Sequence, residues 1–468
     1  MKQWQPKLVI IGAGSSGLGT ALAAARRGWK VLVLDAGDIA GGTSSASTKL
    51  IHGGVRYLEN ALKHLSWADW QLVREALRER AWMLQSHSSL CWTLPIVLPV
   101  RSLGEKAYYG TGLKLYDYLS YPYRLKATQW IERDELYAIF PQLKKGFIGG
   151  WRYYDGQFMD RLYAVHLALF LKQRYGVEIR TYHRVVGIHP RSQGTEVKVQ
   201  TEEGLSYTEE ADVLISAAGP WADELRKQAN PQAPSRMRLS RGSHIVVPAT
   251  ALPIQEGFLI PRTKDGRILF VLPWLEETIL VGTTEVEVAS PENRPGVPPE
   301  EEAYLTEYMR SYFDIEEVPV VARFAGLRPL VAAKATSTAR LARSHVVEVW
   351  KEYRLVNLMG GKWTTFRAMG EDALRTAAQM LDISLPTGEP VSSIEPDLSP
   401  LHRLRSQYAQ PILSSLPYTE GELYFWQREG WGAHPYDIVE GRWLLPFIDQ
   451  RRAQDMLKAL HNFQIHTH

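Results

Sequence analysis

The pattern of apolar and polar residues at the N-terminus predicts a strand, a helix and a second strand, in that order. Lys7–Ile11 and Lys30–Leu34 are short apolar runs of the kind that form buried strands. Between them, Ser15–Arg27 is rich in alanine and leucine, and Gly28 stands where a helix would end. Elements in this order form two parallel strands joined by a crossover helix.

Farther along, helices and strands continue to alternate. Apolar residues at steps of three and four predict a long helix over Glu59–Ser86. The segments Val197–Thr201 and Ser206–Glu209 are predicted to pair as a hairpin, and Asp212–Ala217 is predicted to be a buried strand. Pro386–Pro400 is rich in proline, serine and acidic residues, so we interpret it as a linker before a helical C-terminal segment. Further strands are expected at Thr93–Val100, Val177–Arg180, His244–Val247, Gly257–Ile260, Ile268–Leu272, Thr278–Val281 and Arg354–Met359, and further helices at Leu162–Tyr175, Glu300–Phe313 and Thr365–Leu381.

Composition narrows the class of protein. The 468 residues allow two or three domains, and 45% hydrophobic with 22% charged residues is typical of a globular chain that buries a large core. A net charge of +3 gives no reason to expect nucleic-acid binding. With Cys91 as the single cysteine, we expect no disulfide framework, no metal site and a reducing compartment. No apolar run approaches the roughly 20 residues that span a bilayer, so we expect no transmembrane helix.

A glycine fingerprint lies between the first predicted strand and helix. In Gly12-Ala-Gly14-Ser-Ser-Gly17, the first glycine makes a tight turn and the second lets a pyrophosphate approach the backbone. The third lets the helix and strand pack closely, and the helix N-terminus attracts phosphate. Asp35 ends the next predicted strand, where its carboxylate can accept hydrogen bonds from ribose hydroxyls. The fingerprint predicts a bound dinucleotide and leaves NAD and FAD as alternatives.

The segment Thr43–Glu59 follows this unit and combines hydroxyls, a lysine, a histidine, glycines and an arginine. It is too polar for a buried helix and too specific in its mixture for an ordinary surface loop. We expect Thr43–Ile51 to run along the cofactor. His52–Tyr57 then turns toward the substrate and carries Arg56 to it.

Several other segments place small residues beside polar or charged ones. The cations Arg56, Arg328 and Lys362 are expected on glycine-flanked turns, available to a phosphate or a carboxylate. The alternative is that they are ordinary surface charges, and His244 can equally be a structural histidine. Gly360–Thr365 resembles part of a P-loop but lacks its upstream glycine, so we reject nucleoside triphosphate binding. The segments are Ala211–Ala222, Ser240–His244, Gly282–Glu285, Gly326–Pro329 and Gly360–Thr365.

Taken together, these residues resemble the FAD-dependent glycerol-3-phosphate dehydrogenases, within the flavoproteins that are similar to D-amino-acid oxidase. Asp35 departs from the glutamate that is frequent in that family, and Trp363 and Phe366 replace residues more often seen as leucine and tyrosine. The C-terminal region is shorter than in members with a full helical domain. The matching pieces run in family order: Ile10–Gly17, Thr43–Glu59, Gly242–Pro248, Pro273–Trp274, Gly282–Glu287, Gly326–Leu330 and Gly360–Arg367.

The resemblance implies an α/β fold, in which a Rossmann-like FAD-binding domain is interleaved with an α+β substrate domain and followed by a short C-terminal helical region. We expect the FAD-binding domain to take residues 1–92, 151–236 and 350–385. The substrate domain would take 93–150 and 237–349, and the helical region 386–468. The resemblance assigns FAD contacts to Gly12, Gly14, Ser16, Gly17, Asp35, Ala36, Thr43, Ser44, Ser45, Ser47, Lys49, Leu50, His52, Gly53, Val185, Ala218, Gly219, Gly361, Lys362 and Thr364.

The implied reaction is oxidation of sn-glycerol 3-phosphate to dihydroxyacetone phosphate, with hydride transfer from C2 to FAD. A base that titrates near neutrality suits this chemistry, so His244 is the first candidate and His52 the second. The cations Arg56, Arg328 and Lys362 would hold the phosphate and polarise the developing carbonyl. Thr283 or Thr284 would bind substrate oxygens. The alternatives are an oxidase of an amino or hydroxy acid and a non-catalytic flavin-binding protein.

The electron acceptor implied by the resemblance is a quinone or oxygen. Aromatic and basic residues gather between Trp67 and Lys126, which suits a peripheral contact with anionic lipid. The alternative is a solvated helix face. We therefore expect a cytoplasmic protein, either free or peripheral at the cytoplasmic face of the membrane. A homo-oligomer is compatible with the family. The two groups are Trp67, Trp70, Arg74, Arg78, Arg80 and Trp82, then Lys106, Tyr108, Tyr109, Lys114, Tyr116, Tyr118, Tyr121, Tyr123, Arg124 and Lys126.

Overall fold

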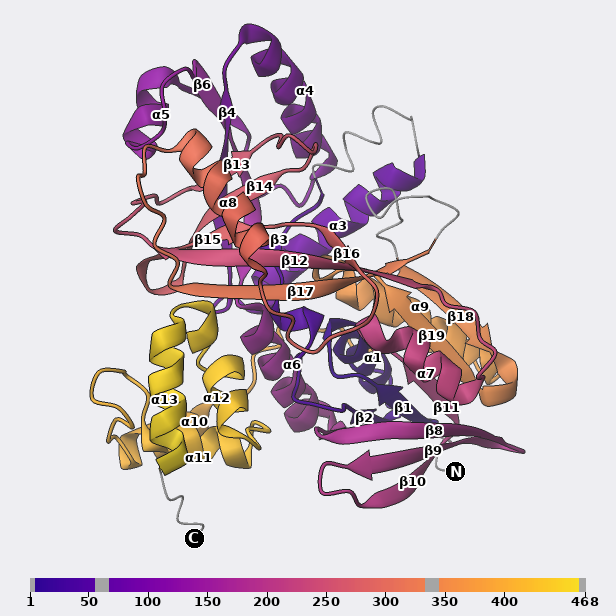
Figure 1. Cartoon of the computed structure of the whole chain (residues 1–468). Helices are drawn as coiled ribbons and strands as arrows, with labels where there is room; N and C mark the ends of the chain where they lie inside the picture. Colours follow the sequence, from indigo (N-terminus) through magenta and orange to yellow (C-terminus); the bar gives the residue numbers. More distant parts are fainter. Residues whose placement is uncertain (1–4, 55–66, 333–344, 463–468) are drawn as a thin grey trace.

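The computed structural model describes residues 5–54, 67–332 and 345–462. Three sheets organise this part of the chain: one of six strands, one of three and one of ten. The six-stranded and ten-stranded sheets lie side by side, and the C-terminal helices pack beside both (Figure 1).

The six-stranded sheet is the predicted dinucleotide-binding core. Its strand order is β18-β19-β11-β1-β2-β7, and β18 alone runs antiparallel to its neighbour. Along β1, Leu8 and Ile10 face one hydrophobic core while Val9 and Ile11 face another, which explains why this run is apolar at every position. The strands are β1 (Lys7–Ile11), β2 (Lys30–Leu34), β7 (Glu178–Arg180), β11 (Val213–Ser216), β18 (His345–Trp350) and β19 (Leu355–Gly360).

Different elements cover the two faces of this sheet. One face carries α1 (Ser15–Ala25), α6 (Asp160–Tyr175) and α9 (Phe366–Met380), whose buried residues share a core. The other face carries α7 and the three-stranded sheet, whose hairpin of β9 and β10 has the predicted antiparallel pairing. These elements are α7 (Ala222–Ala229), β8 (His183–Arg191), β9 (Gly194–Thr201) and β10 (Ser206–Ala211).

The ten-stranded sheet is assembled from distant parts of the chain. Its main order is β16-β12-β15-β14-β13-β4-β6-β3, with β17 paired to β12 and β5 paired to β6. Helix α8 (Pro299–Tyr312) and helix α5 (Arg133–Ile139) cover one apolar face. The strands are β3 (Leu50–Ile51), β4 (Cys91–Val100), β5 (Gln129–Glu132), β6 (Gly149–Phe158), β12 (Met237–Pro248), β13 (Gly257–Ile260), β14 (Leu269–Trp274), β15 (Thr278–Gly282), β16 (Val286–Val288) and β17 (Ala322–Val331).

Helices α3 and α4 extend beyond these sheets (Figure 1). Helix α3 (Trp67–Ser86) is the described part of the predicted long helix, whose first residues lie outside the described ones. Its Arg80 is buried and forms an ion pair with Asp155, so it does not belong to a surface patch. Helix α4 (Leu103–Leu119) was not predicted as a helix, and it starts where the Ser102 hydroxyl accepts a hydrogen bond from the Glu105 N–H.

The C-terminal helices share hydrophobic cores with both large sheets. Trp426 and Ile438 pack in the same core as α1 and α6, whereas Leu444 and Phe447 pack against the ten-stranded sheet. The expected linker is itself packed, because Ile394 is fully buried and its N–H donates to the Ser86 carbonyl. The helices are α10 (Ser399–Gln407), α11 (Glu420–Arg428), α12 (Pro435–Gly441) and α13 (Gln450–Asn462).

Two further expectations from sequence differ from the structure. Gly326–Pro329 lies inside strand β17 rather than on a turn, and Arg328 pairs in register with Ser240 of β12. The prediction of a turn was wrong because glycine and proline suggested one, while pairing with β12 keeps the backbone extended. Strand β6, of which residues 151–158 were expected in the FAD-binding domain, pairs with β4 in the ten-stranded sheet.

Candidate functional site

A cavity of about 580 Å³ runs from the glycine fingerprint to the surface of strands β12 and β17. Its walls include the first turn of α1, the segment after β2, the turn after β11 and the turn after β19. The six-stranded sheet contributes its carboxyl ends, which is where parallel sheets bind ligands. The cavity therefore joins a dinucleotide-binding edge to the residues expected to act on a substrate.

The three glycines of the fingerprint leave room for close backbone packing. Gly12 has a φ of +108°, and a Cβ there would lie 2.5 Å from the Ala217 carbonyl oxygen. A Cβ on Gly17 would lie 1.8 Å from the carbonyl oxygen of Gly12, so helix α1 could not approach β1. The N-terminal turn of α1 consequently faces the cavity through Ser15 and Ser16. This geometry is suited to a pyrophosphate.

Asp35 lies at the end of β2 and lines the cavity. Its carboxylate accepts hydrogen bonds from the Ala13 N–H at 2.6 Å and the Gly37 N–H at 2.9 Å. Burial raises the pKa of Asp35 to about 6, although both hydrogen bonds act in the opposite direction. A carboxylate with two oxygens retains acceptor capacity for ribose hydroxyls.

The hydroxyls of the segment after β2 anchor it to its surroundings. The Ser44 hydroxyl accepts a hydrogen bond from the Ser15 N–H at 3.0 Å. Thr43 donates to the Leu327 carbonyl, and Ser47 donates to Asp160 at 2.7 Å. Lys49 is buried and forms an ion pair with Asp160 at 2.7 Å. The segment thus bridges α1, α6 and β17, which holds its backbone along the cavity.

His244 projects from β12 and is buried beside the cavity. Its Nε2 lies 3.0 Å from the Thr48 hydroxyl, and its ring stacks on Phe324 with 4.8 Å between centroids. Its buried Nδ1 has no hydrogen-bond partner among the described residues. Burial lowers the pKa of His244 well below its ordinary value, and the positive charges of Arg328 and Lys49 lower it further. The ring is therefore neutral near pH 7.

Arg328 lies on β17 and lines the same cavity. Its guanidinium donates to the Thr284 carbonyl at 3.1 Å and to the Thr283 hydroxyl at 3.0 Å. A Cβ on Gly242 would lie 2.4 Å from this guanidinium, so glycine provides the space that it occupies. Thr284 is buried, accepts a hydrogen bond from the Ser243 N–H and donates to Glu301. The two threonines thus contact neighbouring protein groups, and Thr283 orients Arg328.

The turn after β19 ties two parts of the site together. Gly360 and Gly361 both have positive φ, which lets the chain reverse before Lys362. The Trp363 indole N–H donates to the Ser44 carbonyl at 2.8 Å, and the Thr364 hydroxyl lies 3.4 Å from the His52 carbonyl. The turn therefore faces the cavity while it supports the Thr43–His52 segment.

The structure brings most of the predicted site residues to one cavity. Arg56 lies outside the described residues. The predicted residues that do not line the cavity are Gly17, Ser45, Lys49, Gly53, Thr283 and Thr284. Those that do are Gly12, Gly14, Ser16, Asp35, Ala36, Thr43, Ser44, Ser47, Leu50, His52, Val185, Ala218, Gly219, His244, Arg328, Gly361, Lys362 and Thr364.

Sequence reasoning missed some lining residues because no local motif marks them. Thr48 lies in the recognised segment, and its contact with His244 was not anticipated. Tyr182, Arg184 and Arg294 also line the cavity, and each comes from a loop or strand with no fingerprint. Trp221 lies in the recognised segment Ala211–Ala222, but it was not predicted to line the site. Only the tertiary arrangement identifies them.

Comparison with known proteins adds the family. The model of the DAO family, described as FAD dependent oxidoreductase, matches residues 7–373. The mitochondrial glycerol-3-phosphate dehydrogenase of Mesocricetus auratus is 36% identical over 388 residues, or 80% of this chain and 53% of its own length. The probable mitochondrial glycerol-3-phosphate dehydrogenase of Dictyostelium discoideum is 32% identical over 511 residues, or 97% of this chain and 80% of its own length. The chain thus spans about half of the first relative and most of the second.

Solved structures share the fold. The glycerol-3-phosphate dehydrogenase from Bacillus halodurans complexed with FAD superposes with a TM-score of 0.75 at 21% identity, covering 99% of this chain and 90% of that one. An L-alpha-glycerophosphate oxidase from Mycoplasma pneumoniae with FAD bound gives a TM-score of 0.64 at 19% identity, covering 84% of this chain and 98% of that one. These likenesses confirm the expected α/β architecture.

Proposed function

The chain belongs to the FAD dependent oxidoreductase (DAO) family, within its glycerol-3-phosphate dehydrogenases, and on that premise we propose that it oxidises sn-glycerol 3-phosphate to dihydroxyacetone phosphate. One observation carries the proposal: His244 and Arg328 line the same cavity as the glycine fingerprint. A hydrogen-bond acceptor and a phosphate-binding cation thus stand together at the substrate end of the dinucleotide site.

The described residues fit FAD. The glycines of the fingerprint and the N-terminus of α1 suit its pyrophosphate, and Asp35 suits its ribose. The turn at Gly361 and Lys362 lines the same cavity, and we assign it to the isoalloxazine. Bound FAD supplies the two-electron acceptor of the reaction.

Arg328 is the proposed anchor of the substrate phosphate. Its guanidinium is oriented by the Thr283 hydroxyl and the Thr284 carbonyl, so it enters the cavity with a defined direction. A planar guanidinium can bind two phosphate oxygens at once. Lys362 lines the same cavity and adds positive charge.

His244 is the proposed acceptor of the C2 hydroxyl proton. Burial and two cations lower its pKa, so the neutral ring that can accept a proton predominates at physiological pH. The same shift makes it a weak base in the empty site. A phosphate dianion on Arg328 would offset the positive charge that lowers this pKa. Substrate binding would therefore strengthen the base that acts on it. His52 lines the cavity and is the second candidate.

An anaerobic titration of the yellow holoprotein tests the proposal. Glycerol 3-phosphate should bleach the absorbance of oxidised flavin, whereas glycerol should bleach it far more weakly because it lacks the phosphate. Bleaching by an amino or hydroxy acid instead would identify an oxidase with the same fold. If no compound of these classes bleached the flavin, the protein would be a non-catalytic flavin-binding protein.

Variants test the two roles separately. Arg328→Met should raise KM for glycerol 3-phosphate by about 10- to 100-fold, since charge-assisted hydrogen bonds contribute roughly 1.5–3 kcal/mol each. Arg238→Met on the adjoining strand removes a cation that does not line the cavity and should leave KM unchanged.

His244→Ala should lower kcat by roughly 10²–10⁴-fold. A loss of only a few-fold would return His244 to a structural role.

We also propose that helix α4 contacts a membrane surface and that the reduced enzyme delivers electrons to a quinone there. Leu103, Tyr118 and Tyr121 are each at least 76% exposed, and Tyr108 and Tyr123 are exposed beside them. Arg124 and Lys126, which follow α4 in the chain, are exposed as well, so exposed cations accompany the exposed aromatic rings. Within the described part of the chain, every helix is too short or too polar to cross a bilayer.

Co-sedimentation with vesicles tests this contact. Vesicles with anionic lipid should bind the protein at low salt and release it at high salt, and neutral vesicles should bind it less. Tyr118→Ser with Tyr121→Ser should weaken binding while leaving flavin bleaching intact. Equal binding by this variant would exclude α4 as the contact. Rapid oxygen consumption without any quinone would identify oxygen as the acceptor.

A further inference from the structure

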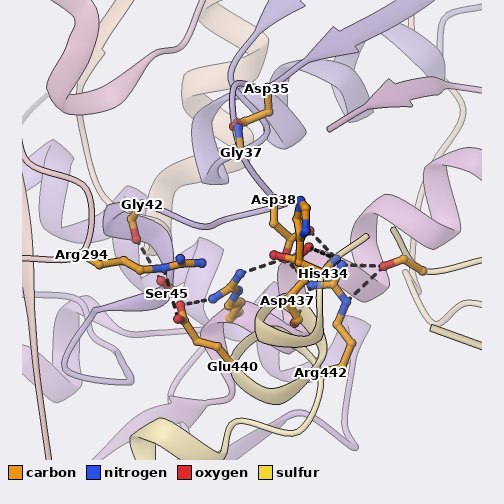
Figure 2. A network of polar contacts seen from close by, with 12 residues as sticks. Asp35, Gly37, Asp38, Gly42, Ser45, Arg294, His434, Asp437, Glu440 and Arg442 are labelled. Carbon is orange, nitrogen blue, oxygen red and sulfur yellow. Dashed lines mark hydrogen bonds and ion pairs between the residues drawn. The ribbon is translucent and has the colours of Figure 1, made fainter. Parts of the chain in front are cut away.

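A fully buried carboxylate, Asp38, lies at the base of the loop that follows β2. Arg161 of α6 approaches it at 2.8 Å, and Arg442, just after α12, approaches its other oxygen at 2.9 Å (Figure 2). All three side chains are fully buried. The two arginines keep the pKa of Asp38 below its ordinary value even though burial acts to raise it. The loop is therefore anchored by Arg442, a residue about 400 positions away in the sequence.

The loop that Asp38 anchors forms one wall of the cavity. Residues 35–38 and 40–43 all line it. The backbone hydrogen bonds of the loop include those from the Ala40 N–H to the Ala13 carbonyl and from the Gly41 N–H to the Asp38 carbonyl. The side chain of Asp38 joins this wall to the C-terminal region.

A second contact reaches the cavity through Tyr182. The Tyr182 hydroxyl donates to Asp437 of α12, and the Tyr182 N–H donates to the Gly37 carbonyl at 3.2 Å. Tyr182 itself lines the cavity. The ring of His434 lies against its ring, with 4.6 Å between centroids. Helix α12 therefore contacts Tyr182 directly and supports Gly37 through it, and both residues belong to the same cavity wall.

A third contact passes through Glu440, also on α12. Its carboxylate pairs with Arg161 and, at 3.2 Å, with Arg294. Arg294 lines the cavity, and its guanidinium lies 4.0 Å from the centre of the Tyr436 ring. Asp38, Arg161, Glu440 and Arg442 thus form one buried ionic network between α6, α12 and the cavity wall. Figure 2 labels Asp38, Glu440 and Arg442 in this network.

We propose that Arg442 is a positioning residue for the FAD-binding loop, and that FAD binding is coupled to docking of the C-terminal helical region 399–462. The arginine does not itself line the cavity and acts through Asp38, which does. Removing it leaves Asp38 buried beside Asp437, with Arg161 as its remaining cation. The loop then loses the fixed position that a dinucleotide requires. This inference rests on FAD binding and does not depend on the identity of the substrate.

The first test measures FAD binding without turnover. Apoprotein of Arg442→Met, titrated with FAD by flavin fluorescence, should bind about 5- to 150-fold more weakly than the wild type, the range typical of coupled sites. Arg428→Met is the matched control, because that arginine belongs to the same region and is 80% exposed. It should bind FAD as the wild type does. Equal affinity in both variants would overturn the proposal.

A double-variant cycle tests whether Arg442 acts through Asp38. Asp38→Asn should weaken FAD binding, and adding Arg442→Met to it should weaken binding by much less than Arg442→Met does alone. Additive losses would mean that Arg442 acts by another route and would contradict the proposed role.

Hydrogen exchange of the wild-type protein tests the reciprocal effect and needs no variant. If the two processes are coupled, FAD must stabilise the docked C-terminal region as much as that region favours FAD. The amides of 434–444 should then exchange more slowly in the holoprotein than in the apoprotein, whereas those of α5, none of whose residues lines the cavity, should change little. Unchanged protection of 434–444 would disprove the coupling, even if the enzyme oxidised glycerol 3-phosphate.

Discussion

The Tyr116 hydroxyl accepts a hydrogen bond from the Gly53 N–H at 2.8 Å and donates its own hydrogen to Asp155 at the same distance. Tyr116 lies on α4, the helix with the exposed aromatic surface, whereas Gly53 follows His52 in the cavity-lining segment. Arg80 of α3 completes the arrangement by pairing with Asp155 at 2.6 Å. One hydrogen bond thus connects helix α4 to the segment that carries His52 into the cavity.

Replacing Tyr116 by phenylalanine should loosen this end of the segment while keeping the ring. We expect a rise of several-fold in KM for glycerol 3-phosphate with unchanged FAD content, because the buried Gly53 N–H loses an acceptor that is worth about 1–3 kcal/mol. Steady-state kinetics measures this. Tyr118→Phe changes an exposed hydroxyl on the same helix and should have no effect. Equal KM values in the two variants would contradict a positioning role for Tyr116.

Gly282→Ala should displace the His244 ring. A Cβ there would lie 2.2 Å from the ring, and Phe324 stacks on that ring at 4.8 Å. We expect a kcat at least tenfold lower, from a misplaced base, in a protein that still binds FAD. Gly112→Ala is the matched control, since a Cβ on that helical glycine meets open space and should stabilise α4 by up to about 1 kcal/mol. Normal turnover in Gly282→Ala would mean that the reaction does not depend on the position of the His244 ring.

The pKa of Asp35 makes the apoprotein sensitive to pH. Burial raises this pKa from 3.8 to about 6, so the folded state holds a proton that the unfolded state has released between these values. The free energy of unfolding should therefore fall by up to roughly 3 kcal/mol as the pH rises through about 6. Asp35→Asn cannot titrate and should lack this component. Urea denaturation of the wild-type and Asp35→Asn apoproteins at several pH values measures their free energies of unfolding. If the two free energies changed with pH in the same way, the prediction would be refuted.

The buried pair of Lys49 and Asp160 should be costly to break. Both side chains are 1% exposed, so Lys49→Met leaves an unpaired buried carboxylate and should destabilise the protein by about 3–5 kcal/mol. Adding Asp160→Asn should restore much of the loss. Lys172 lies on the same helix as Asp160 and forms an exposed pair with Glu429, so Lys172→Met should cost less than about 1 kcal/mol. Chemical denaturation measures the free energy of unfolding of both variants. Similar losses for Lys49→Met and Lys172→Met would contradict the prediction.

Local pattern was enough to predict the dinucleotide-binding unit. Strands β1 and β2 have the predicted bounds, because their apolar runs are buried on both faces and end at glycine or aspartate. Strand β6 escaped prediction because its buried polar residues do not look like a strand. Gln157 satisfies its amide with Trp92 and the Pro273 carbonyl, which come from distant segments. A local sequence pattern does not show that distant residues will satisfy the hydrogen bonds of a buried amide.

The sequence by itself determined the cofactor class and predicted the residues that we propose carry the chemistry. The glycine fingerprint requires close backbone contacts that only glycine permits, and the Thr43–Glu59 segment is specific enough to identify a family. Only the tertiary structure decided how the site is held together. Arg442 reaches Asp38, Tyr116 reaches Gly53, and Thr48 reaches His244 across separations that no local pattern records. The physical reason is that a buried charge or amide is satisfied by whichever group the fold brings near it.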